Sequence, residues 1–333
     1  MIDLDACVEG VLACDRIWLG RAVTLVESTR AGDRELAGEL LGRLLAHTGN
    51  IKEAKEAKDV KRVGITGVPG VGKSTFIDTL GTHLTGKGHR VAVLAVDPSS
   101  VVSGGSILGD RTRMPNLAVD DAAYIRPSPS SGLLGGVTRT TRETMVVVEA
   151  AGFDVVLVET VGAGQSETAV AGMVDLFLVM MLPGAGDELQ GIKKGVLELA
   201  DILVVNKADG GNEIAAQRAV RDHRAALALT APAQPNWVPP VLAVSAIEGT
   251  GIDQVWRHIQ DYFGQATASG QLAGRRADQQ VRWMWAMVHD RLQDRLQKSP
   301  AVANLMPSLE QEVAAGRTTP ATACDRIFAA FDG

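Results

Sequence analysis

One nine-residue segment constrains the fold of this chain more than any other: Gly67-Val68-Pro69-Gly70-Val71-Gly72-Lys73-Ser74-Thr75. It fits the pattern G-x-x-x-x-G-K-[ST], a phosphate-binding loop that joins a strand to a helix. An apolar run ending at Thr66 precedes the segment, and a helix-like run beginning at Phe76 follows it. A chance glycine-rich turn is the alternative, and it is disfavoured because strand, loop and helix follow one another in the required order.

The residue types in this segment each have a chemical reason. Glycines let successive backbone N–H groups point at phosphate oxygens, and the N-terminus of the following helix adds free N–H groups and partial positive charge. We expect Lys73 to contact the β- and γ-phosphates, Ser74 to offer its hydroxyl to Mg²⁺, and Thr75 to lie near the α-phosphate. The segment therefore predicts a nucleoside triphosphate site in which Lys73 is also catalytic.

A second motif predicts which base is bound. Asn206-Lys207-Ala208-Asp209 follows an apolar run and fits N-K-x-D, the guanine-reading motif of GTPases. Asp209 can accept hydrogen bonds from guanine N1–H and the 2-amino group, two donors that adenine lacks. Ser245-Ala246 follows the last apolar run and matches the companion loop, where we expect the Ala246 N–H, with Ile247 beside it, to meet the base. An ordinary Asn-Lys turn at a strand end is the alternative.

Carboxylates at other strand ends are candidates for the Mg²⁺ site. Glu159-Thr160-Val161-Gly162 stands where many GTPases carry Asp-x-x-Gly. We expect Glu159 to hold Mg²⁺ through water and the Gly162 region to meet the γ-phosphate, so both are predicted to be catalytic. Asp97 and Asp110 are further candidate Mg²⁺ ligands, with a strand-end turn as the alternative for Asp97.

The group that activates water is open. A Ras-like protein would place Gln directly after the glycine, but Ala163 stands there and Gln165 lies two residues further on. We therefore expect slow intrinsic hydrolysis that rises when a partner orders the loops.

The spacing of apolar runs predicts the fold class. Between Lys61 and about Gly264 they alternate with helix-like segments, which is typical of a parallel sheet with helical crossovers. Six runs are predicted as strands: 63–66, 91–96, 154–158, 176–182, 202–205 and 241–244. We predict an α/β P-loop NTPase with a mostly parallel central sheet flanked by helices, and ligands at the carboxyl ends of the strands.

Segments outside this region are predicted to be helical. Helices are expected over 3–29 and 34–47, then a small-residue linker over 265–275, and tail helices near 279–297 and 319–331. The first tail helix is apolar enough to need a cover, which predicts a homodimer, with intramolecular packing as the alternative. The expected domains are an N-terminal helical extension (1–58), a P-loop GTPase domain (59–264) and a C-terminal helical dimerisation arm (265–333).

Composition narrows the class of protein. The chain has 333 residues and a net charge of −6, and no basic patch with interleaved aromatics, so nucleic acid is not an expected partner. Its three cysteines form no C-x-x-C, which argues against a disulfide framework or a zinc site. Acidic residues near the start and the lack of a membrane-length apolar run predict a cytoplasmic protein with no membrane partner.

The motifs together resemble the MeaB/ArgK family of methylmalonyl-CoA mutase-associated GTPases, whose human relative is the MMAA protein. The resemblance extends over nearly the whole chain, including both helical extensions. It rests on the two nucleotide motifs and on three further segments: 96–100 (Val-Asp-Pro-Ser-Ser), 159–167 (Glu-Thr-Val-Gly-Ala-Gly-Gln-Ser-Glu) and 182–195, which begins Leu-Pro-Gly-Ala-Gly-Asp-Glu-Leu-Gln. Ala163 departs from the family, where a larger aliphatic residue is expected.

The resemblance implies a role beyond hydrolysis. It implies a homodimeric G-protein chaperone that protects adenosylcobalamin-dependent methylmalonyl-CoA mutase and gates loading of its cofactor. It also implies that Asp187 and Lys193 lie on a mobile loop that couples the nucleotide state to the mutase. The chain has no D-x-H-x-x-G cobalamin signature, so any cofactor contact is expected through the partner.

Three other functions compete with this one. An ATP-dependent kinase of amino-acid transport binding proteins is disfavoured by the guanine motif. A nickel-insertion GTPase would carry clustered Cys or His, whereas the six histidines here are scattered. A scaffold with an inactive nucleotide site is disfavoured because Lys73, Ser74, Asp97 and Glu159 are all present.

Overall fold

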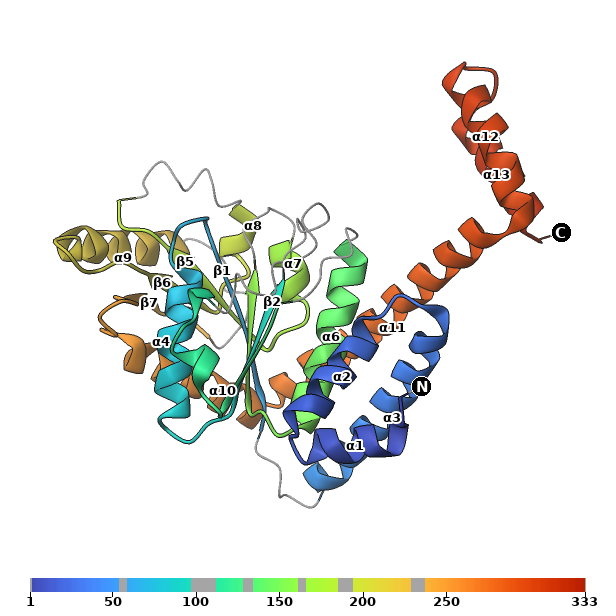
Figure 1. The fold of residues 1–333 in the computed structure, drawn as a ribbon. Helices are drawn as coiled ribbons and strands as arrows, with labels where there is room; N and C mark the ends of the chain where they lie inside the picture. Colours follow the sequence, from blue (N-terminus) through green and yellow to red (C-terminus); the bar gives the residue numbers. More distant parts are fainter. Residues whose placement is uncertain are drawn as a thin grey trace. The chain divides into compact units, whose positions relative to one another are not determined.

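The computed structural model describes residues 2–53, 59–96, 112–127, 134–160, 166–184, 194–228 and 237–332. Within these ranges the central element is a seven-stranded parallel sheet in the order β3-β2-β4-β1-β5-β6-β7 (Figure 1). The strands are β1 (Lys61–Gly67), β2 (Val91–Val96), β3 (Ala123–Pro127), β4 (Val155–Thr160), β5 (Leu176–Met181), β6 (Ile202–Val205) and β7 (Val241–Ala243).

The strand order reverses its direction at β1. From β1 the chain moves to one side of the sheet for β2, β3 and β4, and β5 then returns to the other side of β1. In open parallel sheets ligands bind outside the carboxyl ends of the strands at such a reversal. The phosphate-binding segment begins at the end of β1, as the sequence predicted.

Helices cover both faces of the sheet, as a parallel sheet with buried strands requires (Figure 1). Alternate strand residues enter two buried apolar clusters, one on each face. One face packs against α4 (Lys73–Thr85), the 3₁₀ turn η1 (Leu117–Val119) and α10 (Ile252–Ala268). The other packs against α6 (Leu134–Ala150), α7 (Ser166–Ala171), α8 (Lys194–Leu197) and α9 (Glu213–Leu227).

The N-terminal region forms three helices that join the cluster on the α6 face: α1 (Leu4–Leu12), α2 (Arg16–Glu27) and α3 (Ala31–Glu53). The single helix expected over 3–29 is wrong, because the chain breaks at Cys14, whose φ is 56°. Asp15 then begins α2 by accepting hydrogen bonds from the Ile17 and Trp18 N–H groups, as an N-cap residue does. Apolar periodicity continues through the break and so concealed it.

Two other elements differ from the expected ones. β3 was not predicted, because Ala-Tyr-Ile-Arg-Pro is short and ends in proline, which a strand tolerates at the edge of a sheet. The expected linker over 265–275 is largely helical, since α10 extends to Ala268 and only two residues separate it from α11 (Gln271–Lys298). A further helix, α12 (Pro300–Ala314), precedes α13 (Pro320–Asp332).

The chain divides into two compact units, residues 1–276 and 277–333, and the division falls inside α11. In the first unit, Arg276 donates two hydrogen bonds to Asp175, and Arg275 donates to the Tyr262 hydroxyl. These contacts tie the start of α11 to the unit that carries the sheet. In the second unit, Arg326 of α13 pairs with Glu312 of α12 at 2.7 Å. Among the described residues, helices long and apolar enough to span a bilayer are absent.

Candidate functional site

The phosphate-binding segment has the backbone that an anion site needs. Gly70 and Gly72 have φ angles of 79° and 94°, in the left-handed region that glycine adopts without strain. Gly72 is the N-cap of α4, and none of the described side chains caps it. The N–H groups of the first turn of α4 are therefore directed at the space above the loop, where the helix dipole favours negative charge.

Two of the glycines are also fixed by close neighbours. A Cβ on Gly67 would lie 2.6 Å from the Met180 carbonyl oxygen, and a Cβ on Gly72 would lie 2.8 Å from Asn206 Nδ2. Met180 lies on β5 and Asn206 directly follows β6. Gly67 and Gly72 are therefore required by close packing against neighbouring strands as well as by phosphate binding.

Lys73 lies at the start of α4, and its ammonium group is held over the loop. Its Nζ donates to the carbonyl oxygens of Gly67 at 2.8 Å and Val68 at 3.4 Å. Burial lowers the pKa of Lys73, while the negative charges of Glu159 and Glu167 act to raise it. Two carboxylates near the ammonium favour its charged form, which is the form that attracts phosphate.

Ser74 and Glu159 bring together two oxygen ligands from different elements. The Ser74 hydroxyl donates to Glu159 Oε1 at 3.0 Å. Glu159 lies near the carboxyl end of β4, next to β1, and is 4% exposed. A hydroxyl and a carboxylate side by side suit a hard cation such as Mg²⁺, so these two predicted ligands fit the metal.

Asn206 connects the base motif to the phosphate loop. Its Nδ2 donates to the Val71 carbonyl at 2.8 Å, and its Oδ1 accepts from the Ala246 N–H at 3.1 Å. One buried amide side chain therefore bridges the phosphate-binding segment and the loop after β7. Through these two bonds Asn206 braces the loop after β7 against the phosphate-binding segment.

Asp209 and Ser245 form the next part of the site. The buried Ser245 hydroxyl donates to Asp209 Oδ2 and accepts from the Glu248 N–H. This arrangement orients the Asp209 carboxylate, which is half-buried. Lys207 is exposed with a φ of 60°, and Ile247 is 79% exposed. An oriented carboxylate flanked by an exposed aliphatic stem and an exposed apolar side chain suits a flat base with N–H donors on its edge.

The remaining predicted site residues cannot be placed. Asp97, Asp110, Gly162, Asp187 and Lys193 lie outside the described residues. Their roles stay predictions.

Three residues of this region were not singled out from the sequence. Thr66 and Thr160 are both buried, and their hydroxyls lie 2.7 Å apart, which links the strand before the phosphate loop to the strand that carries Glu159. The Thr79 hydroxyl of α4 donates to the Ala246 carbonyl at 2.6 Å. The position of Thr160 directly after Glu159 could have indicated from the sequence that Thr160 belongs to the site. Nothing in the sequence indicates that Thr79 does.

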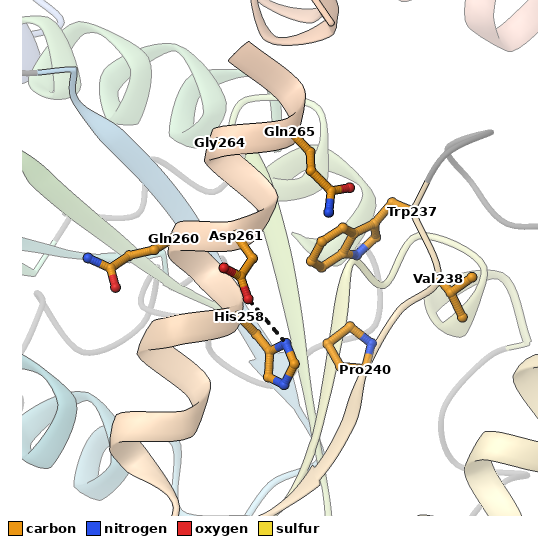
Figure 2. A pocket seen from close by; sticks show the side chains of 8 residues that line it. All are labelled: Trp237, Val238, Pro240, His258, Gln260, Asp261, Gly264 and Gln265. Atoms are coloured by element: carbon orange, nitrogen blue, oxygen red, sulfur yellow. Dashed lines mark ion pairs between the residues drawn. The ribbon is translucent and has the colours of Figure 1, made fainter. Parts of the chain in front are cut away.

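A cavity of about 580 Å³ lies elsewhere, between the segment before β7 and α10 (Figure 2). Trp237, His258, Asp261 and Gln265 are among the residues that line it. None of the predicted nucleotide-site residues that the structure describes lines this cavity, so it is separate from the described site around β1.

Comparison with known proteins gives this site a context. The family described as "Methylmalonyl Co-A mutase-associated GTPase MeaB" matches residues 19–301. The chain belongs to this family. A "Putative GTPase" of Caulobacter vibrioides is 55% identical over 330 residues, covering 99% of this chain and 98% of that protein.

Other relatives carry different names. The mouse protein "Methylmalonic aciduria type A homolog, mitochondrial" is 45% identical and covers 98% of this chain and 79% of its own length. "GTPase ArgK" of Escherichia coli is 47% identical, covering 81% of this chain and 79% of that protein. The crystal structure of a protein named LAO/AO transport system kinase covers 100% of both chains with 34% identity and a TM-score of 0.76. The chain is thus a GTPase of the MeaB family with a P-loop NTPase fold, and the predicted fold class and resemblance are confirmed.

Proposed function

We propose that this chain binds and hydrolyses GTP with Mg²⁺ and acts as a G-protein chaperone of adenosylcobalamin-dependent methylmalonyl-CoA mutase in the cytoplasm. The observation that carries the nucleotide part is the continuous contact from Val71 through Asn206 to Ala246, with Asp209 oriented beside it by Ser245. A phosphate loop and a guanine-reading loop joined in this way form one pocket for one nucleotide.

The residues divide the work between the two ends of the nucleotide. The segment from Gly67 to Thr75 holds the phosphates, with Lys73 supplying positive charge. Asp209 selects guanine, with Ser245, Ala246 and Ile247 beside the base. We propose Gly162 at the γ-phosphate and Asp187 and Lys193 on the loop that communicates with the mutase.

Ser74 and Glu159 would hold Mg²⁺, with Asp97 and Asp110 as further proposed ligands. Bound Mg²⁺ would neutralise charge that develops on the phosphate oxygens during transfer to water. The chain's own residues position the reactants: Ser74 and Glu159 face each other at 3.0 Å, and Lys73 lies at the start of the same helix as Ser74.

Family membership supports the mutase as partner, since the matching family is named for its association with that enzyme. The mouse relative is named for methylmalonic aciduria. The proposal does not require a cobalamin site on this chain, because a chaperone can act by binding the mutase.

We also propose a homodimer. Five exposed apolar side chains lie on one face of α11: Val281, Met284, Trp285, Val288 and Leu292. A stripe of this kind is costly to leave in water, and a second copy carrying the same stripe is a self-complementary cover.

The kinase named in one structural relative is the competing function. The arrangement of Asp209 favours guanine, because an adenine would place no donors on its carboxylate. Calorimetric titration with GTP and ATP separates the two, and tighter binding of ATP would favour the kinase.

The chaperone role is tested by GTP turnover with and without purified methylmalonyl-CoA mutase. We expect the mutase to raise the rate and to co-elute with the chain. Lys73→Ala is the matched control, because it removes the phosphate contact while leaving the partner surface. Unchanged turnover combined with separate elution would refute the mutase assignment and leave the GTPase assignment standing.

A further inference from the structure

Thr79 lies one turn after the phosphate-binding segment on α4, and it contacts a distant part of the chain. Its hydroxyl lies 3.0 Å from the Thr75 carbonyl and 2.6 Å from the carbonyl of Ala246. Thr and Ser hydroxyls within helices usually bond the carbonyl four residues earlier, as Thr82 does with Asp78 at 2.8 Å. Thr79 also lies within hydrogen-bond distance of the carbonyl four residues earlier, but its shorter contact is with the Ala246 carbonyl in the loop after β7.

The acceptor of this bond is buried and belongs to the base-reading loop. Ala246 is 2% exposed. Its N–H donates to Asn206 and its carbonyl accepts from Thr79, so both of its backbone polar groups are held by side chains from other elements. A buried carbonyl that loses its donor is destabilising, so the loop would move to regain a partner.

These bonds form a closed path through the nucleotide site. It runs from the Val71 carbonyl to Asn206, then to Ala246, then to Thr79, and returns to Thr75 at the start of the same α4 helix. The phosphate end and the base end of the pocket are thus joined on two sides, by Asn206 and by Thr79. Gly249, in the same loop, lies near the Thr79 methyl group, since a Cβ added to Gly249 would be 3.9 Å from Thr79 Cγ2.

We propose that Thr79 is a positioning residue for guanine selection, which fixes the base-reading loop at a set distance from the phosphate-binding helix. It touches neither base nor phosphate in this role and acts through Ala246 and the adjoining Ser245, which orients Asp209. This inference rests on the proposed guanine site and assigns it a determinant that the N-K-x-D motif does not contain.

The test measures the affinities of GDP and inosine diphosphate for the full chain and for Thr79→Val. Inosine diphosphate lacks the 2-amino group. The ratio of the affinity for GDP to the affinity for inosine diphosphate therefore reports how well the Asp209 carboxylate binds that group. We expect Thr79→Val to lower GDP affinity roughly tenfold, the effect of losing one buried hydrogen bond, and to lower the preference for GDP over inosine diphosphate.

Two variants control for a general structural effect. Thr79→Ser keeps the hydroxyl and should restore both the affinity and the ratio. Thr82→Val makes the same chemical change on the same helix and should leave both unchanged, because among the described residues the Thr82 hydroxyl bonds an intrahelical carbonyl alone.

The inference is overturned if Thr79→Val keeps the wild-type ratio, or if it weakens both nucleotides equally while lowering the Tm. Failure of the underlying site has a different signature. If the wild-type chain binds ADP as tightly as GDP, the guanine site itself is wrong, whereas a wild-type preference that survives Thr79→Val removes only the role of Thr79.

Discussion

At the scale of single residues, this site depends on side chains that each make two hydrogen bonds to different parts of the chain. Asn206 uses both ends of its amide, one on the phosphate loop and one on the base loop. Ser245 uses its hydroxyl both as donor and as acceptor. Such residues have little freedom to move independently, which keeps the pocket in one arrangement before a nucleotide arrives.

Glu159 gives a sharp prediction at this scale. Glu159→Gln keeps the shape of the side chain but removes the charge that faces Ser74 and attracts Lys73. We expect the Mg²⁺ concentration for half-maximal GTP turnover to rise about 10- to 100-fold, the usual effect of weakening the support of a metal site. Titration of turnover with Mg²⁺ measures this. Glu248→Gln is the matched control, since Glu248 is exposed, and an unshifted Mg²⁺ curve for Glu159→Gln would contradict the assignment.

The motifs identified these residues, but the sequence did not predict the hydrogen bonds between them. Each of the two motifs, for phosphate and for guanine, has a fixed internal spacing, because its loop must present particular groups to one part of the nucleotide, so Lys73 and Asp209 could be named from the sequence alone. Thr79 could not, because its importance comes from a carbonyl 167 residues further along the chain. A threonine in a helix has no pattern that reports which loop packs against it.

At the scale of elements, the start of α11 is held by buried charges. Asp175 is fully buried and accepts from the Arg62 N–H at 3.1 Å and from Arg276 at 2.8 Å and 2.6 Å. Arg62 also pairs with Glu149, whose charge raises the pKa of Arg62 against the opposing effect of burial. The positive charges of Arg62 and Arg276 are thus matched by the negative charges of Asp175 and Glu149.

Asp175→Ala should therefore be strongly destabilising. It leaves two largely buried arginines with one carboxylate, and breaking a buried pair of this kind costs about 3–5 kcal/mol of the free energy of unfolding. Asp222→Ala is the comparison, because Asp222 and Arg218 are both exposed and 3.9 Å apart, and we expect about 0.5 kcal/mol or less. Denaturant unfolding of both variants measures the difference, and equal midpoints would show that Asp175 has no such role.

On α9, His223 predicts a dependence on pH. Burial lowers the pKa of His223 below its ordinary value of 6.5, with Asp222 acting in the opposite direction. Below pH 6.5 the unfolded chain takes up a proton that the folded chain resists, so stability falls as the pH drops from that value. We expect the Tm to fall less between pH 7.5 and 5.5 in His223→Gln than in the wild type. His83, whose pKa burial also lowers, is present in both, and parallel curves would refute the prediction.

The elements differ in how far sequence predicted them. Strands β2 and β5 consist entirely of buried apolar residues, and β4 begins with four of them, so these strands could be predicted from the sequence. Edges and breaks were harder. β3 pairs on one side only, so its sequence need not be continuously apolar, and the break at Cys14 is marked only by the capping residue Asp15. The small residues between 265 and 275 indicate a linker by composition, yet alanine, glutamine and arginine are good helix formers.

At the scale of the whole molecule, the exposed stripe on α11 predicts assembly. Its members recur at intervals of three, one, three and four residues, from Val281 to Leu292, which places them on one helix face. Trp285 is 54% exposed and Leu292 is 50% exposed. Light scattering of the purified full chain should give twice the mass of one chain.

Two charged variants test whether the stripe is the interface. Trp285→Glu combined with Leu292→Glu places two carboxylates in an apolar contact, where unpaired charge is costly, so we expect a monomer at micromolar concentration. Gln293→Glu combined with Gln297→Glu adds the same charge to the opposite side of the helix, and this variant should stay dimeric. Each variant keeps Arg275 and Arg276, so the anchor of α11 on Asp175 and Tyr262 is intact. A full chain with the mass of a single copy, or a stripe variant that remains a dimer, would show that α11 serves a different contact.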